Sequence, residues 1–265
     1  MDSAVVTGAG RGLGRAIAAR LAHRGLAVTA TDVNAEGAVR TAEEIGSGAT
    51  STRLDVRDAE GCRRVAAEAA QRGRLAVWVN NAGILRTEPA WEQADATVEQ
   101  IVHVNLLGVI NGCRAALPHM RSGGGRILNI ASLSSLGAAP GLAVYGATKH
   151  GVLAYSISLQ AELQDAGIPV EVRAICPDAI ETDMVRERAQ DPEASLIFSG
   201  ALLTADEVAD RAIRLLYGKS ILVTVPRARG ALARAIYLAP RAGLRLLPAF
   251  KKLGERNRER WREAG

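Results

Sequence analysis

The chain has 265 residues, 48% of them hydrophobic, which is enough for a single large α/β domain with a substantial buried core. Only 3% of the residues are aromatic, and none of these interleaves with basic residues in the main part of the chain, so we expect no nucleic acid partner. The three cysteines are widely spaced, and the four histidines lack metal-ligand spacing, so we expect neither a disulfide framework nor a catalytic metal.

The first predicted strand is the apolar run at residues 4–6, and a glycine-rich turn, Thr7-Gly-Ala-Gly-Arg-Gly-Leu-Gly14, separates it from an amphipathic helix. Glycines let the backbone approach a pyrophosphate, and the amides at the start of the helix attract the anion. The spacing, Gly8-x-x-x-Gly12-x-Gly14, differs from the common Gly-x-Gly-x-x-Gly fingerprint. Because a strand precedes the turn and a helix follows it, we favour a dinucleotide phosphate loop over a glycine-rich hairpin.

The region around this strand also bears on location. Met1 leads almost directly into the strand, which leaves no room for a signal peptide, and no run reaches the length of a membrane span. The sequence therefore predicts a cytoplasmic protein.

The second predicted strand, residues 27–31, leads into Asp32, eighteen residues beyond Gly14. In dinucleotide-binding folds an acid here accepts hydrogen bonds from the adenosine ribose, and it would repel a 2′-phosphate by about 4 kcal/mol at an effective dielectric near 20. Asp32 therefore predicts NAD, with NADP less favoured. Arg11 is the opposing signal, since a guanidinium within the turn suits a phosphate. The alternative role for Asp32 is an N-cap or turn acid.

Further along the chain, polar groups suited to proton transfer follow the predicted fifth strand. Ser132 closes the strand-like run 126–132, at the edge where open parallel sheets bind ligands. Tyr145 and Lys149 have the i, i+4 spacing that places a phenol and an ammonium on one face of a helix. We expect Lys149 to lower the pKa of Tyr145, so that the phenol serves as a general acid or base.

Strand-like runs alternate with helical patterns up to a seventh strand at residues 221–225, which predicts right-handed crossovers and a doubly wound parallel sheet. We assign residues 1–225 to a single dinucleotide-binding and catalytic domain. The remaining residues, 226–265, form a basic amphipathic C-terminal extension with eleven Lys/Arg and three Glu, a net charge of +8. Its apolar residues, interrupted by Pro226, Pro240 and Pro248, suggest short helices.

Two roles for the extension stay open. An apolar helical stripe can fold over the substrate cleft or pack against a neighbouring subunit. A cationic amphipathic helix can instead make peripheral contact with an anionic membrane.

Several motifs together resemble the short-chain dehydrogenase/reductase family, over roughly residues 3–225. Besides the glycine turn and the Tyr-x-x-x-Lys pair, the chain has Asp55-Val56, Asn80-Asn-Ala-Gly83, Asn105 and Ser132 in the family's order. The resemblance implies a Rossmann-type, doubly wound, seven-stranded parallel sheet flanked by helices. It also implies a catalytic tetrad of Asn105, Ser132, Tyr145 and Lys149, in which Asn105 would hold a water linked to Lys149.

The resemblance also implies the cofactor site. Asp55 would lie near the adenine, and residues 81–83 would shape the cofactor floor. The implied residues are Gly8, Arg11, Gly12, Leu13, Gly14, Asp32, Asp55, Val56, Asn81, Ala82, Gly83, Tyr145, Lys149, Pro177, Ile180 and Thr182.

One position departs from the family pattern, because Asp178 follows Pro177 where the family usually has glycine. We interpret Asp178 as a solvated turn carboxylate, in preference to a negative charge at the mouth of the substrate site. The variable segments 133–142 and 184–203 would bound that site by resemblance. Their apolar residues, which include Leu133, Leu136, Pro140, Leu142, Met184, Leu196, Ile197 and Phe198, would suit a lipophilic substrate.

The resemblance thus implies hydride transfer between NAD(H) and a secondary alcohol or ketone, with Tyr145 as general acid/base, in a homodimer or homotetramer. The alternative within enzymes is an NADPH-dependent ketone or 3-oxoacyl reductase. Outside catalysis, the alternatives are a cofactor-binding sensor or scaffold, or a peripheral membrane protein attached through residues 226–265.

Overall fold

The computed structural model describes residues 1–46 and 48–264, and its centre is one parallel sheet with the strand order β3-β2-β1-β4-β5-β6-β7. The order reverses beside β1, which places a topological switch point at the carboxyl ends of β1 and β4. The predicted seven-stranded, doubly wound sheet is confirmed. Its strands are β1 (Asp2–Thr7), β2 (Ala27–Asp32), β3 (Thr50–Arg53), β4 (Arg74–Asn80), β5 (Gly125–Ile130), β6 (Val170–Pro177) and β7 (Leu222–Val225).

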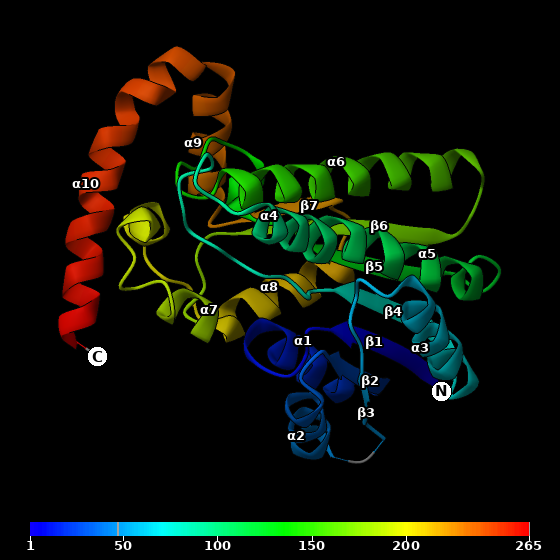
Figure 1. Cartoon of the computed structure of the whole chain (residues 1–265). Coiled ribbons are helices and arrows are strands. Elements are labelled where there is room, and N and C mark those ends of the chain that lie inside the picture. The colour runs from blue at the N-terminus through cyan, green and yellow to red at the C-terminus, as the bar shows by residue number, and fades with distance from the viewer. Residues whose placement is uncertain (47, 265) are drawn as a thin grey trace.

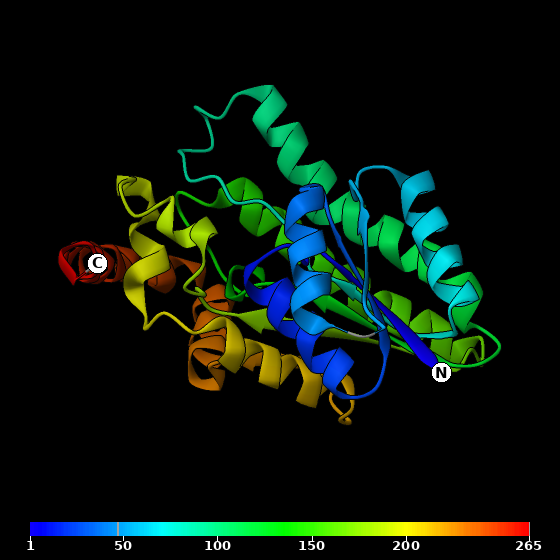
Figure 2. The ribbon, with the colours of Figure 1, turned by 90° about the horizontal axis from the view of Figure 1, so that it is seen from below.

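Helices cover both faces of the sheet (Figure 1, Figure 2). Apolar residues of α3, α5 and α6 form the core on one face, and those of α1 and α8 form the core on the other. The helical segments are α1 (Gly12–His23), α2 (Ala35–Ile45), α3 (Ala59–Gln71), α4 (Asp95–Val102), the π-helical η1 (His103–Leu107), α5 (Gly108–Met120), η2 (Leu133–Ser135), α6 (Ala143–Asp165), α7 (Asp183–Arg186), η3 (Pro192–Ser199), α8 (Ala205–Leu216), α9 (Arg227–Leu238) and α10 (Pro240–Ala264).

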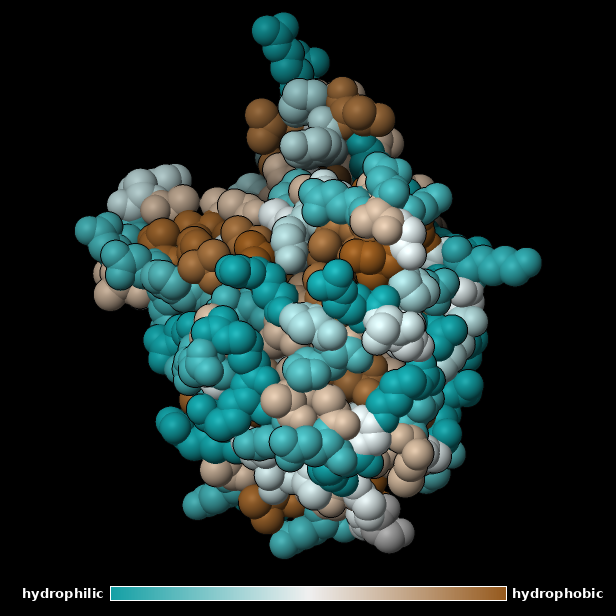
Figure 3. Space-filling model, turned by 90° about the vertical axis from the view of Figure 1, so that its right-hand side faces the viewer, coloured by the Kyte–Doolittle hydropathy of each residue, from teal (hydrophilic) through white to brown (hydrophobic). Residues whose placement is uncertain are grey.

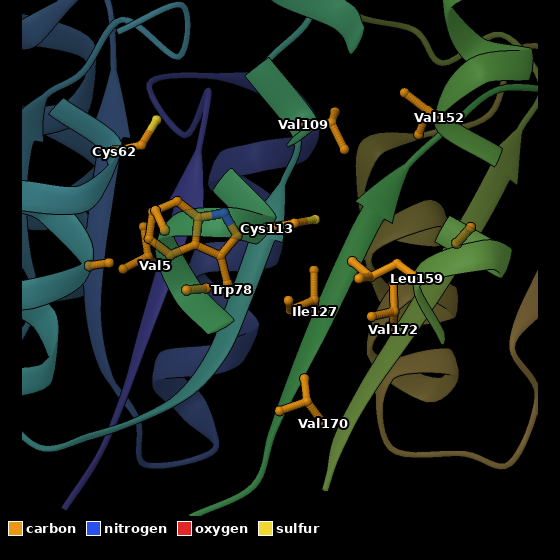
Figure 4. Packing of buried hydrophobic residues seen from close by; sticks show 14 of the residues in the cluster. Val5, Cys62, Trp78, Val109, Cys113, Ile127, Val152, Leu159, Val170 and Val172 are labelled. Carbon is orange, nitrogen blue, oxygen red and sulfur yellow. The ribbon is translucent and has the colours of Figure 1, made fainter. Parts of the chain in front are cut away.

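Trp78 lies within the buried hydrophobic core (Figure 4). A chain of buried polar groups begins at its indole. The Trp78 indole donates to Asn80 Oδ1 at 2.7 Å, and Asn80 Nδ2 donates to Asn129 Oδ1 at 2.8 Å. Asn129 Nδ2 then donates to Ser156 Oγ at 2.9 Å. Satisfied buried networks of this kind specify a unique packing. This one ties the carboxyl ends of β4 and β5 to α6, and so positions the residues that follow those strands.

One helical stretch, Asp95–Met120, is long and apolar enough to cross a membrane by length and composition, contrary to our expectation from the sequence. It comprises α4, η1 and α5, and it packs against α3, α6 and β4 within the domain. Central helices of soluble folds have the same length and composition, so this stretch carries no argument for a membrane span.

The C-terminal extension forms two helices that meet at a sharp corner (Figure 1). Pro240 begins α10, as predicted, but the predicted break at Pro248 is wrong because that proline lies inside the 25-residue helix. The carbonyl that loses its partner belongs to Leu244, which is exposed, so water can satisfy it. Gly265, the last residue assigned to the extension, lies outside the described residues.

The inner face of α10 packs tightly on η3. A Cβ added at Gly254 would overlap the carbonyl oxygen of Ser195, so the two backbones are in direct contact. Asn257 Nδ2 donates to the Phe198 carbonyl at 3.0 Å, and the Phe198 and Trp261 rings lie 5.7 Å apart. The extension therefore holds the segment 192–199 in place.

We expect Gly254→Val to separate α10 from η3, because the added side chain has no space beside Ser195. Limited proteolysis of the full-length protein should then cleave the extension about tenfold faster, as local unfolding exposes backbone. Ala249→Val is the matched control, since it adds the same side chain at an exposed position of α10. Equal cleavage rates for wild type and Gly254→Val would contradict the proposed role of this contact.

Candidate functional site

A cavity of about 520 Å³ opens at the carboxyl ends of the strands. All the residues predicted for the cofactor line it, and so do three of the four predicted catalytic residues, Ser132, Tyr145 and Lys149. Asn105 is the exception, because it is fully buried behind the cavity wall. The fold thus brings together side chains that lie far apart in the sequence.

The glycine turn forms one end of the cavity. Gly8 and Gly12 have φ values of 62° and 54°, a backbone region that favours glycine. A Cβ at Gly14 would overlap the Gly8 carbonyl oxygen, so this position cannot carry a side chain without moving the turn. No side chain caps the start of α1. The first backbone N–H groups of α1 therefore have no side-chain acceptor. They are available to donate to an anion in the cavity.

Thr7 and Asn81 lock this turn to the end of β4. Thr7 Oγ1 accepts from the backbone N–H groups of Asn81 at 3.0 Å and Ala82 at 3.1 Å. Asn81 Nδ2 in turn donates to the carbonyls of Thr7 and Gly8, each at 2.9 Å. The sequence predicts Asn81 and Ala82 as site residues but assigns no role to Thr7. Its position at the end of β1, directly before the first glycine, was the available signal.

Asp32 ends β2 with its carboxylate fixed against the turn. Oδ2 accepts from the Gly10 N–H and Oδ1 from the Asn34 N–H, each at 2.9 Å. The alternative role of Asp32 as an N-cap is wrong, because Asn34 caps α2 by accepting from the Gly37 N–H. The alternative role as a turn acid is confirmed, since its carboxylate accepts from the backbone two residues on. Asp32 lines the cavity, so its charge lies beside whatever binds there.

Arg11, the opposing signal in cofactor choice, is directed towards two carboxylates. Its Nη1 lies 3.2 Å from Asp183 Oδ2 and 3.8 Å from Glu187 Oε1. These pairs are exposed and weak, but they satisfy the guanidinium without a phosphate.

The acid predicted near the adenine, Asp55, lines the cavity together with Val56. Arg57 donates to its carboxylate through the backbone at 3.0 Å and through the guanidinium, and these hydrogen bonds lower the pKa of Asp55. Asn111 holds Val56 by donating to its carbonyl at 3.0 Å. Asp55 is therefore ionised at neutral pH.

Tyr145 lies in the first turn of α6 and is partly buried at the cavity wall. Desolvation raises the pKa of its phenol to about 12, while a hydrogen bond with Ser132 acts in the opposite direction. Lys149 Nζ donates to the Ile130 carbonyl at 2.8 Å and lies 5.7 Å from the centre of the Tyr145 ring. Burial lowers the pKa of Lys149 to about 8. Our expectation that Lys149 lowers the pKa of Tyr145 is wrong for this arrangement, because the ammonium is turned towards β5 and desolvation of the phenol dominates.

Asn105 lies in η1, where the helix widens to π-helical geometry, a feature that often marks functional sites. Its Oδ1 accepts from the Ile84 N–H at 2.8 Å, and its Nδ2 donates to the Ile84 carbonyl at 2.9 Å. A Cβ added at Gly83 would lie 3.3 Å from Asn105 Oδ1 and 3.7 Å from Lys149 Nζ. In this structure Asn105 therefore fixes the segment that separates it from Lys149.

Asp178 is buried and forms an ion pair with Arg229 of α9. The Arg229 guanidinium also donates to the Ser199 carbonyl at 3.2 Å and to Ser199 Oγ at 3.0 Å. Burial raises the pKa of Asp178, although the charge of Arg229 lowers it. The prediction of a solvated turn carboxylate is wrong, because the extension brings a cation to this residue and covers it.

The other end of the cavity is apolar. Among the residues predicted there, Leu133, Leu142, Met184, Leu196 and Ile197 line it, whereas Leu136, Pro140 and Phe198 do not. Phe198 packs instead against Trp261. One of the roles left open for the extension, folding over the substrate cleft, is confirmed. Its inner faces supply residues that the sequence did not single out as lining, namely Arg229, Leu232, Ala233, Ile236, Leu247 and Phe250.

Within residues 1–46 and 48–264, no cluster of three His, Cys, Asp or Glu side chains could hold a metal ion. The polar residues that line the cavity with these apolar side chains include Ser132, Tyr145, Lys149 and the Asp178–Arg229 pair. Two hydroxyls and a nearby ammonium can donate and accept protons at a bound oxygen atom.

Comparisons with known proteins agree with this geometry. The family model for short chain dehydrogenases matches residues 2–193. The chain is 38% identical to 2-(R)-hydroxypropyl-CoM dehydrogenase of Xanthobacter autotrophicus, over 82% of this chain and 91% of that protein. It is 35% identical to 3beta-hydroxysteroid dehydrogenase 1 of Eggerthella lenta, over 83% and 88% of the two chains.

Among solved structures, the 3-ketoacyl-(acyl-carrier-protein) reductase of Brucella melitensis, crystallised with NADH, superposes with a TM-score of 0.78. Its sequence is 30% identical, and the match covers 86% of this chain and 98% of that one. Family model, relatives and fold agree. The chain therefore belongs to the short-chain dehydrogenase/reductase family, the NAD(P)-dependent oxidoreductases that act on CH–OH groups.

Proposed function

We propose that this enzyme transfers a hydride between NAD(H) and a lipophilic secondary alcohol or ketone, with Tyr145 as the general acid/base. One observation carries the proposal: the Ser132 and Tyr145 hydroxyls lie in a single cavity that has a glycine turn and Asp32 at one end and apolar side chains at the other. A dinucleotide fits the first end and an apolar molecule the second.

The residues of the turn fit a dinucleotide. The amides at the start of α1 carry no side-chain cap, and a Cβ at Gly12 would lie 3.2 Å from Thr182 Cγ2, in space that glycine leaves open. Gly8, Gly12 and Thr182 would therefore hold the phosphates and the nicotinamide end, while Asp32 would accept from the adenosine ribose. When bound, NAD supplies the hydride acceptor and donor of the reaction.

The proton chemistry belongs to the protein. In reduction the Tyr145 phenol gives its proton to the developing alkoxide, and in oxidation the phenolate takes it from the alcohol. The Ser132 hydroxyl donates to the same substrate oxygen and orients it. Lys149 is largely protonated at neutral pH, since its pKa is about 8, and so provides positive charge in the buried site. Asn105 positions the segment between itself and Lys149 through its two bonds to Ile84.

NAD is the proposed cofactor because Asp32 is fixed at the cavity while Arg11 is paired with Asp183 and Glu187. Titration of the full-length protein, followed by nicotinamide fluorescence, should show tighter binding of NADH than of NADPH. Asp32→Ala should reduce or abolish this preference, because the carboxylate contributes repulsion of about 4 kcal/mol against a 2′-phosphate before screening. Arg11→Ala is the complementary control, and it should leave NADH binding nearly unchanged. Tighter binding of NADPH by the wild type would reverse the proposal.

The substrate class is tested by turnover. With NAD, the enzyme should oxidise steroid, retinoid or long-chain secondary alcohols, because the substrate end of the cavity is lined by leucine, isoleucine, methionine and phenylalanine. Turnover of small polyols or sugars in place of these would overturn the lipophilic assignment. The main alternative is an NADPH-dependent ketone or 3-oxoacyl reductase, and a preference for NADPH together with acyl-thioester reduction would favour it.

The proposal includes a cytoplasmic homodimer or homotetramer built on the helices that contain Asn105 and Tyr145. Leu107 and Ile157 are exposed on these helices and would be covered in such an assembly.

A further inference from the structure

The corner between α9 and α10 stands out from the body of the molecule and exposes apolar side chains. Leu238 is 84% exposed, Leu244 60%, Tyr237 58% and Leu246 49%. Figure 3 shows hydrophobic residues on this corner, which projects from the molecule at the top of the view. Side chains of this kind gathered on one projection are unusual for a surface that meets only water.

Basic side chains follow the apolar corner on both helices. Arg241 and Arg245 are exposed in the first turns of α10, and Arg234 and Lys252 are exposed further from the corner on α9 and α10. Of the basic side chains described on α9 and α10, only Arg229 and Lys251 form salt bridges with acids. The guanidinium groups at the corner are therefore available for a negatively charged partner.

The same two helices form part of the cavity wall. Ile236 of α9 and Leu247 and Phe250 of α10 line the cavity. All three lie within a few helical turns of the corner. Leu232 also lines the cavity and is 43% exposed, so the apolar lining reaches the surface beside the corner. A molecule in contact with the corner thus lies next to the apolar end of the site.

We propose that the α9–α10 corner docks on an anionic membrane surface, with Leu238 and Leu244 at the acyl boundary and the arginines at the headgroups. The positive charge of the corner favours anionic lipid over a second copy of the chain as its partner. Two copies meeting at this corner would bring their arginine clusters together, whereas anionic lipid complements them. If the proposed function holds, a lipophilic substrate then enters the cavity from the membrane. The docking itself does not depend on the proposed function.

The test is co-sedimentation of the full-length protein with vesicles of phosphatidylcholine and phosphatidylglycerol in equal parts, and with vesicles of phosphatidylcholine alone. We expect binding to the anionic vesicles, with affinity lowered by salt, and little binding to the neutral ones. Leu238→Glu/Leu244→Glu should reduce the partition coefficient about tenfold or more, and so should Arg241→Glu/Arg245→Glu. None of these four residues lines the cavity.

The control is Val39→Glu/Arg64→Glu, which makes one change of each kind on α2 and α3, far from the corner (Figure 1). It lowers the net charge by three, one for Val39 and two for Arg64, which is between the two of the leucine variant and the four of the arginine variant. It should leave vesicle binding unchanged apart from the loss of net charge. Equal loss of binding in the control and corner variants would overturn the proposal, as would equal binding of wild type to anionic and neutral vesicles. If Leu238→Glu/Leu244→Glu instead converts a larger oligomer to a smaller one in sedimentation velocity, a second copy covers the corner and the membrane proposal is wrong.

The outcome is separable from that of the proposed function. Turnover of a short, water-soluble secondary alcohol requires the cavity but no membrane, so corner variants should retain it. Vesicle binding without any dehydrogenase activity would leave the docking surface standing and reject the proposed substrate. Dehydrogenase activity without vesicle binding would reject the docking surface and leave the proposed function standing.

Discussion

Tyr145→Phe is expected to lower kcat by about 10²- to 10⁴-fold, the range over which a positioned general acid or base contributes to rate. The substitution keeps the ring and removes only the hydroxyl that exchanges a proton with the substrate. NADH affinity should stay within about twofold, because Phe leaves the packing around the cavity intact. Steady-state assays in both directions, with NADH titration, measure the two effects separately.

The pH profile adds a second readout. Because the pKa of Tyr145 is raised to about 12, the phenol is protonated at neutral pH and ready to donate. Oxidation requires the phenolate, so its rate in the wild type should rise with pH, and this rise should be absent in Tyr145→Phe. Tyr155→Phe is the matched control, since Tyr155 lies on the same helix, packs against the core and lies outside the cavity. A pH-dependent kcat near the wild-type value in Tyr145→Phe would assign the proton to another group.

Arg229→Ala is expected to destabilise the protein by about 3 kcal/mol at neutral pH, because it leaves the Asp178 carboxylate buried without its cation. Removing one partner of a buried ion pair costs about 3–5 kcal/mol of unfolding free energy. We expect the lower value, since the Arg229 side chain is 26% exposed. Urea unfolding measures the change. Arg227→Ala on the same helix is the control, and it should change stability by no more than about 0.5 kcal/mol, because its side chain is exposed.

The sign of the pH dependence follows from the raised pKa of Asp178. A carboxyl whose pKa is higher in the folded state binds more protons there, so its cost to stability is absent below the unfolded pKa and grows as pH rises. Loss of Arg229 removes an attraction that lowers this pKa, so the penalty should be largest near neutral pH and shrink as the pH falls towards the unfolded pKa of about 3.9. A penalty independent of pH would mean that Arg229 acts through packing and not through its charge.

The double variant Asp178→Ala/Arg229→Ala provides the complementary test. It removes both charges, and so it should be less destabilised than Arg229→Ala alone. If the double variant is the less stable of the two, the pair contributes no mutual compensation. The pair also matters for the site, because it attaches α9 to the loop after β6 and to Ser199 of η3.

The sequence by itself determined the features whose signals lie within a few residues of one another. Apolar runs alternating with helical patterns predicted the parallel sheet, and the turn from Gly8 to Gly14 predicted a phosphate loop because only glycine permits its backbone. The i, i+4 spacing of Tyr145 and Lys149 placed both at one cavity. These signals are local because backbone geometry and side-chain direction in a helix or strand depend on near neighbours.

The tertiary structure decided what depends on residues distant in the chain. The burial of Asp178 and its pairing with Arg229 could not be read from the preference of Asp for turns, because the partner belongs to another element. The direction of Lys149 towards Ile130, and hence the dominance of burial over charge in the pKa of Tyr145, follows from packing around α6. Helix α10 continues through Pro248, and its contact with η3 at Gly254 holds the part of the helix that follows. Desolvation and packing are sums over neighbours that only the folded chain brings together.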